Sequence, residues 1–175
     1  IKGARGCSVQ QVSIEPMGLV GDRVFTLLLE GKLANQKQVP KLVEIQPTWL
    51  SDGSWCLSHA SMEDFTLTPS ASGQSKIVDI YSKLVPTVDQ GNDVANWLSA
   101  ATGQEVRLVK MTDAVDWFIP LPEFAPVHGH KQAKFVDAAP ILLTNENSLH
   151  DLNERLAIAV PMTRFRANIV VGGLA

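Results

Sequence analysis

Residues 23–33 read RVFTLLLEGKL, an apolar run that stops at Glu30-Gly31 and then resumes. A short run of apolar and β-branched residues, bounded by a turn dipeptide, predicts the two strands of a β-hairpin. Similar runs and turn signals, including Asp52-Gly53, recur from Gly6 to about Lys83. Short strands at this spacing are typical of a β-meander or a small barrel. We therefore expect an all-β domain over residues 1–88.

The first clear helix signal is DQGNDVANWLSAATGQ, residues 89–104. Val94, Leu98 and Ala101 would share one helix face. Asn92 or Asp93 can cap the start, and Gly103 supplies the stop. A strand, EVRLVKM, is expected at residues 105–111.

The composition changes near Asp89, which places the domain boundary there. Residues 89–175 are then a linker helix and the N-terminal, incomplete portion of a second domain of mixed α and β structure. The expected fold class is therefore mainly β with an α+β second part, and the second part holds two helices.

The second part opens with a Pro-rich stretch over residues 112–134, which is expected to be a long connecting loop. Residues 133–157 then predict a strand followed by a helix, with Asn145 as the cap. In this helix Leu149, Leu152 and Leu156 form the expected buried stripe. Residues 164–173, RFRANIVVGG, are expected to return as a strand.

Composition and charge exclude several function classes. The formal net charge is -3, whereas general nucleic-acid and membrane-surface proteins need a broad cationic field. No apolar run is long enough to span a bilayer. Cys7 and Cys56 are far apart, so neither a disulfide framework nor a zinc site is indicated, and a reducing cytoplasm is expected. Because the sequence does not begin with Met and stops within a strand pattern, we interpret it as a fragment.

Three places along the chain carry candidate ligand-binding side chains. In a strand, Arg164, Arg166 and Asn168 would share one face, and guanidinium and amide groups suit phosphate or carboxylate oxygens. Exposure on an edge strand is the alternative for all three. Arg23, after the turn glycines, could point into a cleft or pair with Asp22. Lys2 could simply be solvated.

Metal and nucleophile patterns are weak. His128 and His130 are two residues apart, but no third ligand is spaced near them, so we expect no metal site. Neither cysteine has a histidine context that marks a nucleophile, and burial as a small apolar residue is expected for both.

Taken in order, the motifs resemble those of MOSC proteins, named for the molybdenum cofactor sulfurase C-terminal domain, in the subgroup with an N-terminal MOSC β-barrel. The matching segments are IKGARGCSV, EPMGLVGDRVF, LANQKQVPKL, DQGNDVANWLSAATGQEVRLVKM, FVDAAPILLTNENSLHDLNERL and PMTRFRANIVV. This resemblance implies a β-barrel domain followed by the start of a MOSC domain, with the molybdenum cofactor (molybdopterin) between them.

Family motifs imply which residues contact the cofactor. Lys2 matches the lysine of the opening K-S-C-x-G pattern, Arg23 the arginine of G-x-R, and Asp137 the aspartate before an apolar strand. Arg166 and Asn168 match the arginine and asparagine of F-R-P-N. The sequence departs from these patterns at Gly3, Ala4 and Ala167, where the family usually has serine, cysteine and proline.

By the same resemblance, the parent protein is an oxidoreductase that reduces small N-hydroxylated compounds with electrons from an iron–sulfur or haem partner or a fused domain. The family's metal-ligating cysteine is expected beyond Ala175, so no catalytic residue is assigned and the fragment alone is expected to be inactive. The alternative is a non-catalytic molybdenum cofactor carrier or sulfur-transfer module, because the family also occurs fused to the cofactor sulfurase.

Overall fold

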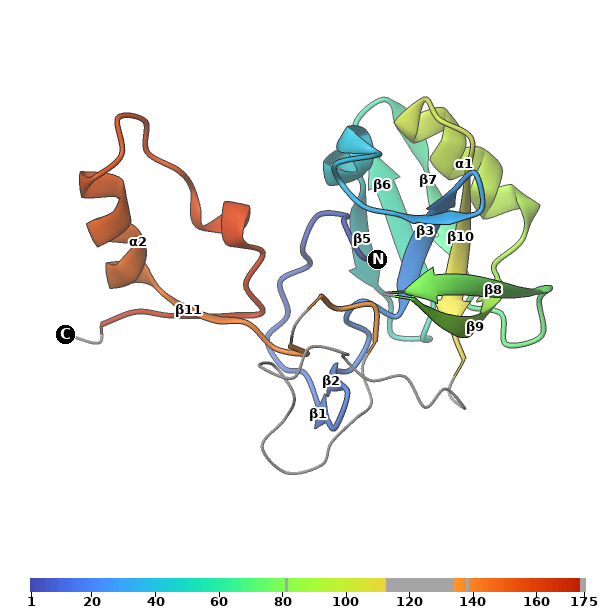
Figure 1. The fold of residues 1–175 in the computed structure, drawn as a ribbon, viewed down its shortest axis with the longest axis horizontal. Coiled ribbons are helices and arrows are strands. Elements are labelled where there is room, and N and C mark those ends of the chain that lie inside the picture. The colour runs from blue at the N-terminus through green and yellow to red at the C-terminus, as the bar shows by residue number, and fades with distance from the viewer. Residues whose placement is uncertain (81, 113–133, 138, 174–175) are drawn as a thin grey trace.

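The computed structural model describes residues 1–80, 82–112, 134–137 and 139–173 of the 175-residue chain (Figure 1). Within these residues the protein is mostly β, with a curled five-stranded sheet, a three-stranded sheet, two short strand pairs and two α-helices. The expected fold class, mainly β with an N-terminal barrel, is confirmed. A C-terminal segment, residues 139–173, extends away from the barrel.

The main sheet has five antiparallel strands. Their order is β4 (Lys32–Ala34), β3 (Phe25–Leu29), β10 (Val106–Met111), β9 (Lys83–Asp89) and β8 (Ser75–Ile80). The two edge strands, β4 and β8, contact each other. The sheet therefore curls into a half-barrel, as twisted sheets do when their edges approach.

Both faces of β3 are buried, which explains why this strand is apolar apart from Thr26. Phe25 and Leu27 belong to one core cluster and Leu28 to another, because successive side chains point to opposite faces. The second cluster lies on the concave face and is completed by Phe135 and Val136. Residues 134–137 thus fill the curl of the half-barrel.

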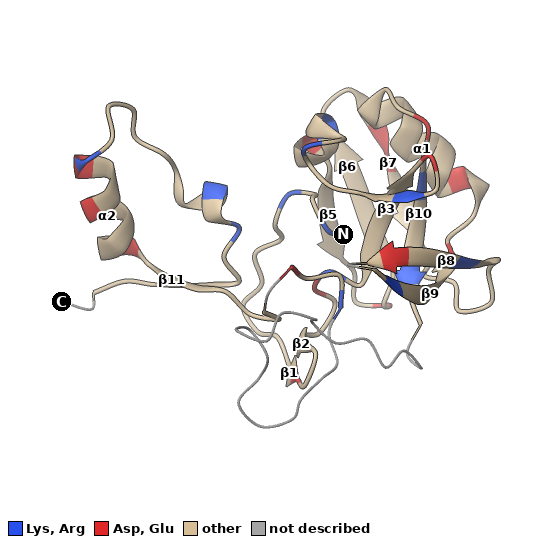
Figure 2. Cartoon of the chain, in the orientation of Figure 1, with Lys and Arg blue, Asp and Glu red and all other residues tan. Residues whose placement is uncertain are grey.

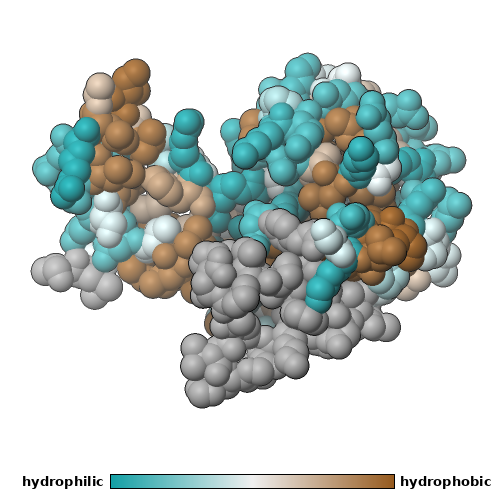
Figure 3. Space-filling model, viewed as in Figure 1, coloured by the Kyte–Doolittle hydropathy of each residue, from teal (hydrophilic) through white to brown (hydrophobic). Residues whose placement is uncertain are grey.

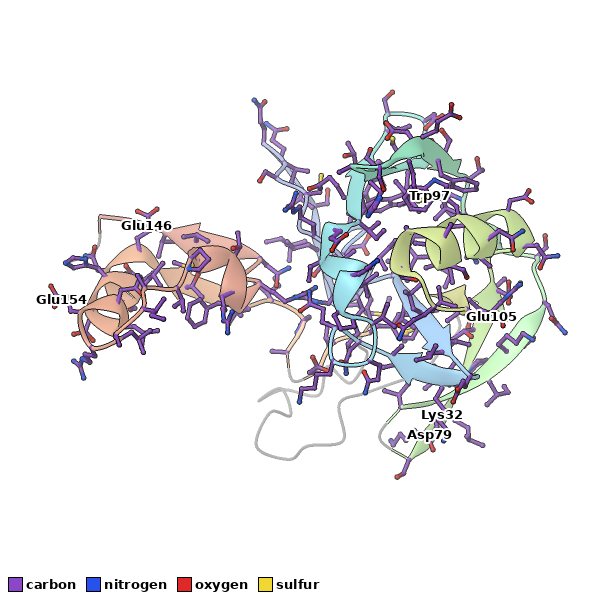
Figure 4. All side chains as sticks on the ribbon, turned by 90° about the horizontal axis from the view of Figure 1, so that it is seen from above. Lys32, Asp79, Trp97, Glu105, Glu146 and Glu154 are labelled. Carbon is purple, nitrogen blue, oxygen red and sulfur yellow. The ribbon has the colours of Figure 1, made fainter. Side chains whose placement is uncertain are left out.

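The convex face is covered by a second layer. This layer comprises η1 (Pro40–Glu44), helix α1 (Asn92–Thr102) and the sheet of β5 (Gln46–Trp49), β6 (Trp55–His59) and β7 (Met62–Leu67). Leu42, Leu57 and Leu98 are fully buried in this layer. The indole N–H of Trp97, labelled in Figure 4, donates to the Glu63 carbonyl at 2.8 Å and ties α1 to β7.

The two predicted hairpin tips are confirmed. Glu30 and Gly31 join β3 to β4 with φ of 51° and 76°, the left-handed pair that a two-residue hairpin turn requires. Gly53 has φ of 83° in the turn between β5 and β6.

For helix α1, the buried face and the end were predicted correctly but the cap was not. Val94, Leu98 and Ala101 are buried, and Gly103 ends the helix in the left-handed conformation. The N-cap is Gly91, with no side-chain cap, because the Asn92 side chain instead accepts a hydrogen bond from Arg107. The Gly91 N–H is bound by the Asp89 carboxylate at 2.8 Å.

The C-terminal segment contains a parallel strand pair and one helix. β11 (Leu143–Asn145) pairs with β12 (Ile169–Val171), and α2 (Glu146–Glu154) follows β11. Asn145 caps α2 as predicted, since its side chain accepts the Asn147 N–H at 2.8 Å. Glu146 and Glu154 mark the ends of α2 in Figure 4, well apart from the barrel.

Two expectations for this segment were wrong. The stripe of Leu149, Leu152 and Leu156 is not buried: α2 has no buried residue, and Leu156 is 40% exposed. Figure 3 shows apolar side chains on the surface of this segment. Residues 164–168 are also not a strand, because η3 (Met162–Phe165) contains Arg164 and Arg166 is left-handed with φ of 55°. Alternation therefore does not align Arg164, Arg166 and Asn168.

The boundary predicted between residues 88 and 89 stays a prediction; α1 and β10, which follow it, pack in the same core as β3. The expected loop at residues 112–134 lies almost wholly outside the described residues. Among the described helices, none has the length and hydrophobicity needed to cross a membrane.

A turn glycine that precedes β3 should be hard to replace. A Cβ on Gly21 would overlap the Trp49 ring, and its φ is 79°. Gly31 has a similar φ of 76° but open space around it. Chemical denaturation should show that Gly31→Ala costs about 1 kcal/mol for the left-handed backbone. Gly21→Ala should cost about 1–2 kcal/mol more because of the overlap. Equal losses in the two variants would contradict this assignment.

The ion pair between Asp89 and Arg107 should stabilise the barrel. Arg107 Nη2 lies 2.6 Å from Asp89 Oδ1, and the Asp89 side chain is 3% exposed. Burial raises the pKa of Asp89, but hydrogen bonds from Arg107 and Gly91 outweigh it and hold the pKa below its ordinary 3.8. We expect Asp89→Asn to cost about 2–3 kcal/mol of unfolding free energy at pH 7.

Because the folded-state pKa is lowered, this contribution is present above about pH 4 and is lost as pH falls through the folded-state value. The stability difference between wild type and Asp89→Asn, measured by urea denaturation, should therefore shrink below pH 4. The exposed pair of Asp151 with Arg155 provides the control, and Asp151→Asn should cost less than about 0.5 kcal/mol. A difference that is constant between pH 7 and pH 3 would refute the role of Asp89.

Candidate functional site

The candidate site lies where the barrel meets the C-terminal segment. Arg23 lies two residues before the start of β3, and its carbonyl accepts the Phe135 N–H at 3.2 Å. Its φ of 47° is left-handed, which is uncommon for a residue with a side chain. Figure 2 shows acidic and basic positions near one another in this part of the fold.

Lys2 and Asp137 form the first pair of the site. The backbone N–H of Lys2 donates to the Phe25 carbonyl at 2.8 Å, so Lys2 lies at the head of β3. Its ammonium group lies 2.7 Å from the Asp137 carboxylate, and its side chain is 10% exposed. Asp137 directly follows the buried residues Phe135 and Val136, while its own side chain is 75% exposed. Lys2 is therefore not a solvated chain end.

Asp22, Arg23 and Asn168 form a second group, across the two parts of the chain. Asp22 Oδ2 accepts from Arg23 Nη1 at 2.5 Å and from Asn168 Nδ2 at 2.7 Å. Arg23 Nη1 also donates to Asn168 Oδ1 at 3.2 Å, and Nη2 donates to the Arg166 carbonyl at 3.3 Å. We call these three residues the clasp. Arg23 pairs with Asp22, one of the two alternatives that the sequence offered, and it also contacts the C-terminal segment.

Asn168 is also held by its own segment. Its Oδ1 accepts the Leu142 N–H at 3.0 Å, and its backbone N–H donates to the Leu142 carbonyl at 2.9 Å. Together with the hydrogen bonds of the clasp, these bonds fix the plane of the Asn168 side-chain amide.

Arg166 differs from the other cations of the site. Burial lowers its pKa, repulsion from Arg23 lowers it further, and attraction to Asp22 and Asp137 opposes both effects. Within the part of the chain that the structure describes, its guanidinium forms no hydrogen bond or ion pair. A half-buried guanidinium without an acceptor is a donor set that favours an anionic ligand.

Sequence reasoning did not assign two further residues to this site. Lys134 is 7% exposed and donates to the Leu19 carbonyl at 2.8 Å. Burial lowers the pKa of Lys134, and Glu15 and Asp22 oppose this shift. Asp22 was considered only as a partner for Arg23. The sequence signal for Asp22 was its position next to Arg23. Its second partner, Asn168, lies 146 positions later in the sequence and could not be found from local pattern.

Other sequence candidates lie outside this cluster. Arg164 is exposed in η3, and neither cysteine is buried as expected: Cys7 is exposed and Cys56 half-buried. Cys56 is half-buried because it lies in β6, where Sγ contacts Asp64 at 3.5 Å. His128 and His130 are outside the described residues. Among those that are described, no group of three or more His, Cys, Asp or Glu could hold a metal ion.

The arrangement brings all five predicted residues to one place through Lys2–Asp137, the clasp and Arg166. Four basic side chains, including Lys134, lie with the carboxylates of Asp22 and Asp137. Lys2 and Arg23 have carboxylate partners, whereas the Arg166 guanidinium has no acceptor among the described residues. Chemically, the site can bind and orient an anion that also accepts hydrogen bonds.

Two family models match the chain: the MOSC N-terminal beta barrel domain over residues 1–105 and the MOSC domain over residues 130–175. Mitochondrial amidoxime-reducing component 1 of Mus musculus is 33% identical over 99% of this chain and 53% of its own length. Molybdenum cofactor sulfurase of Caenorhabditis briggsae is 27% identical over 99% of this chain and 23% of its own length.

A solution structure of a Bordetella bronchiseptica protein matches with a TM-score of 0.45 and 18% identity, over 59% of this chain and 90% of that one. The chain spans about half the length of the amidoxime-reducing components it matches. The first family model covers more than half of the chain, and its span contains the three-stranded sheet, α1 and the half-barrel strands β3, β4, β8 and β9. The chain therefore belongs to the family of proteins that carry a MOSC N-terminal beta barrel domain.

Proposed function

We propose that this chain forms the cofactor-binding part of a molybdenum-dependent oxidoreductase that reduces N-hydroxylated compounds. The observation that carries the proposal is the Arg166 guanidinium, half-buried beside Arg23 and without an acceptor among the described residues. Relatives named amidoxime-reducing component align over nearly the whole chain and supply the reaction class.

The residues of the site fit a phosphorylated, hydrogen-bonding cofactor such as molybdopterin. Arg166 would bind its anionic group, since a guanidinium presents a planar fork of donors to phosphate oxygens. Lys2, held by Asp137, and Arg23, held by Asp22, would line the same site and add positive potential. Asn168 and Asp137 would supply amide and carboxylate groups for the organic part. When bound, the cofactor supplies a metal centre that can accept an oxygen atom and exchange electrons.

Substrate, electron donor and compartment are further parts of the proposal. The substrate is a small N-hydroxylated compound, and the reducing electrons come from an iron–sulfur or haem protein or a fused domain. The protein acts in the cytoplasm. The substrate class rests on the relatives' names, the electron donor on the resemblance of the sequence motifs, and the compartment on composition.

A non-catalytic cofactor carrier or sulfur-transfer module is the second candidate. It is favoured by the alignment of molybdenum cofactor sulfurases over 99% of the chain. Both functions need the same anion site. Only the oxidoreductase would turn over an N-hydroxylated substrate.

The full-length protein should therefore be purified from cells grown with molybdate. We expect it to contain stoichiometric molybdenum by elemental analysis and to reduce an amidoxime with a chemically reduced dye as electron donor. Molybdenum without turnover would favour the carrier. Absence of molybdenum would refute both functions.

Replacing Arg166 should separate stability from binding. A glycine at φ of 55° relieves about 1 kcal/mol of left-handed strain, and removal of the guanidinium ends its desolvation and its repulsion by Arg23. We expect Arg166→Gly to unfold at an equal or higher denaturant concentration than wild type while its molybdenum content falls several-fold. Arg166→Ala should lose molybdenum equally but keep the backbone strain.

Arg164→Ala is the matched control for this experiment, because Arg164 is exposed two residues away and makes no contact with the clasp among the described residues. It should retain both stability and molybdenum. Normal molybdenum content in Arg166→Gly would show that Arg166 does not bind the cofactor.

A further inference from the structure

We propose that Asp22 is a positioning residue, whose carboxylate holds Arg23 and Asn168 so that Arg166 presents its guanidinium to an anionic ligand. The inference rests on the proposed function and extends it to a residue that does not itself bind the ligand. Asp22 acts through other groups. A carboxylate in an anion site is otherwise unfavourable, because it repels the ligand.

The geometry shows what Asp22 fixes. Its Oδ2 accepts from Arg23 Nη1 and from Asn168 Nδ2, so one oxygen orients a guanidinium from the barrel and an amide from the C-terminal segment. Arg23 then has its Nη2 directed at the Arg166 carbonyl at 3.3 Å. Arg166 is thereby held through its backbone, which leaves its side chain available.

Charge supports the same role. The guanidinium groups of Arg23 and Arg166 repel each other. The Asp22 carboxylate attracts the Arg166 guanidinium and so opposes this repulsion. Without the Asp22 carboxylate, two half-buried guanidinium groups would lie together with less compensation. The Arg166 side chain would then be expected to move toward solvent, since an exposed cation is better hydrated.

The clasp also connects the barrel to the C-terminal segment. Asp22 and Arg23 belong to the barrel, and their partners lie 143 to 146 positions later in the sequence. The core clusters of the barrel do not include Asp22. Loss of its carboxylate should therefore loosen the C-terminal segment while the barrel stays folded.

The test uses the full-length protein, prepared without cofactor, and inorganic phosphate as the probe in calorimetric titrations at low salt. Asp22→Asn raises the net positive charge of the site, so a purely electrostatic role predicts tighter phosphate binding. A positioning role predicts the opposite, a weakening of about tenfold, because the oriented donors are lost. Asp22→Glu, which keeps the carboxylate, should recover part of the affinity.

A second measurement reports on position directly. In wild type the Asn168 side-chain NH2 should exchange slowly with solvent, because it donates to Asp22. NMR should show exchange at least about tenfold faster in Asp22→Asn, with the backbone signals of β3 and β10 nearly unchanged. Asp151→Asn, which removes an exposed carboxylate on the C-terminal segment, is the matched control and should alter neither measurement.

Three results would overturn the proposal: tighter or equal phosphate binding by Asp22→Asn, unchanged Asn168 exchange in that variant, or no phosphate binding by wild type. A different experimental result would show that the proposed function is wrong. If the full-length protein contains no molybdenum but phosphate binding weakens in Asp22→Asn, the cofactor assignment fails and the role of Asp22 stands.

Discussion

The contact between Arg23 and the C-terminal segment is the interaction on which the site depends. Arg23 is held by Asp22 and donates to Asn168 and to the Arg166 carbonyl, so that one guanidinium links residues more than 140 positions apart. This link uses charged and amide groups that are only partly exposed, where hydrogen bonds to ions are stronger than at an open surface. The position of Arg166 follows from it.

The half-barrel provides the rigid side of this contact. β3 is buried on both faces, and its neighbours β10 and β4 fix its register. Residues 134–137 fill the concave face and bring Asp137 to Lys2. Apolar packing thus sets the backbone positions of Lys2, Arg23 and Asp137, and the polar groups are oriented on that frame.

The site also contains features that oppose stability. Arg23 and Arg166 both have left-handed φ, and burial lowers the pKa of Arg166 and Lys134. Such strain and desolvation persist where the surrounding structure compensates for them, and they are typical of binding sites. Here the compensation comes from the clasp and from the Lys2–Asp137 pair.

The sequence by itself determined the β-rich class, the two hairpin tips, the buried face and end of α1, and the cap of α2, because these depend on side-chain period and on residues with special backbone preferences. Family motifs selected Lys2, Arg23, Asp137, Arg166 and Asn168. Only the tertiary structure decided their partners. Local pattern put Arg164 beside Arg166 on a strand and gave Asn92 a capping role, whereas Arg166 is left-handed and the Asn92 side chain accepts from Arg107. Arg23 pairs with Asn168, 145 positions away. Pairing across more than 100 residues leaves no local signal, because it arises when separate parts of the chain pack together.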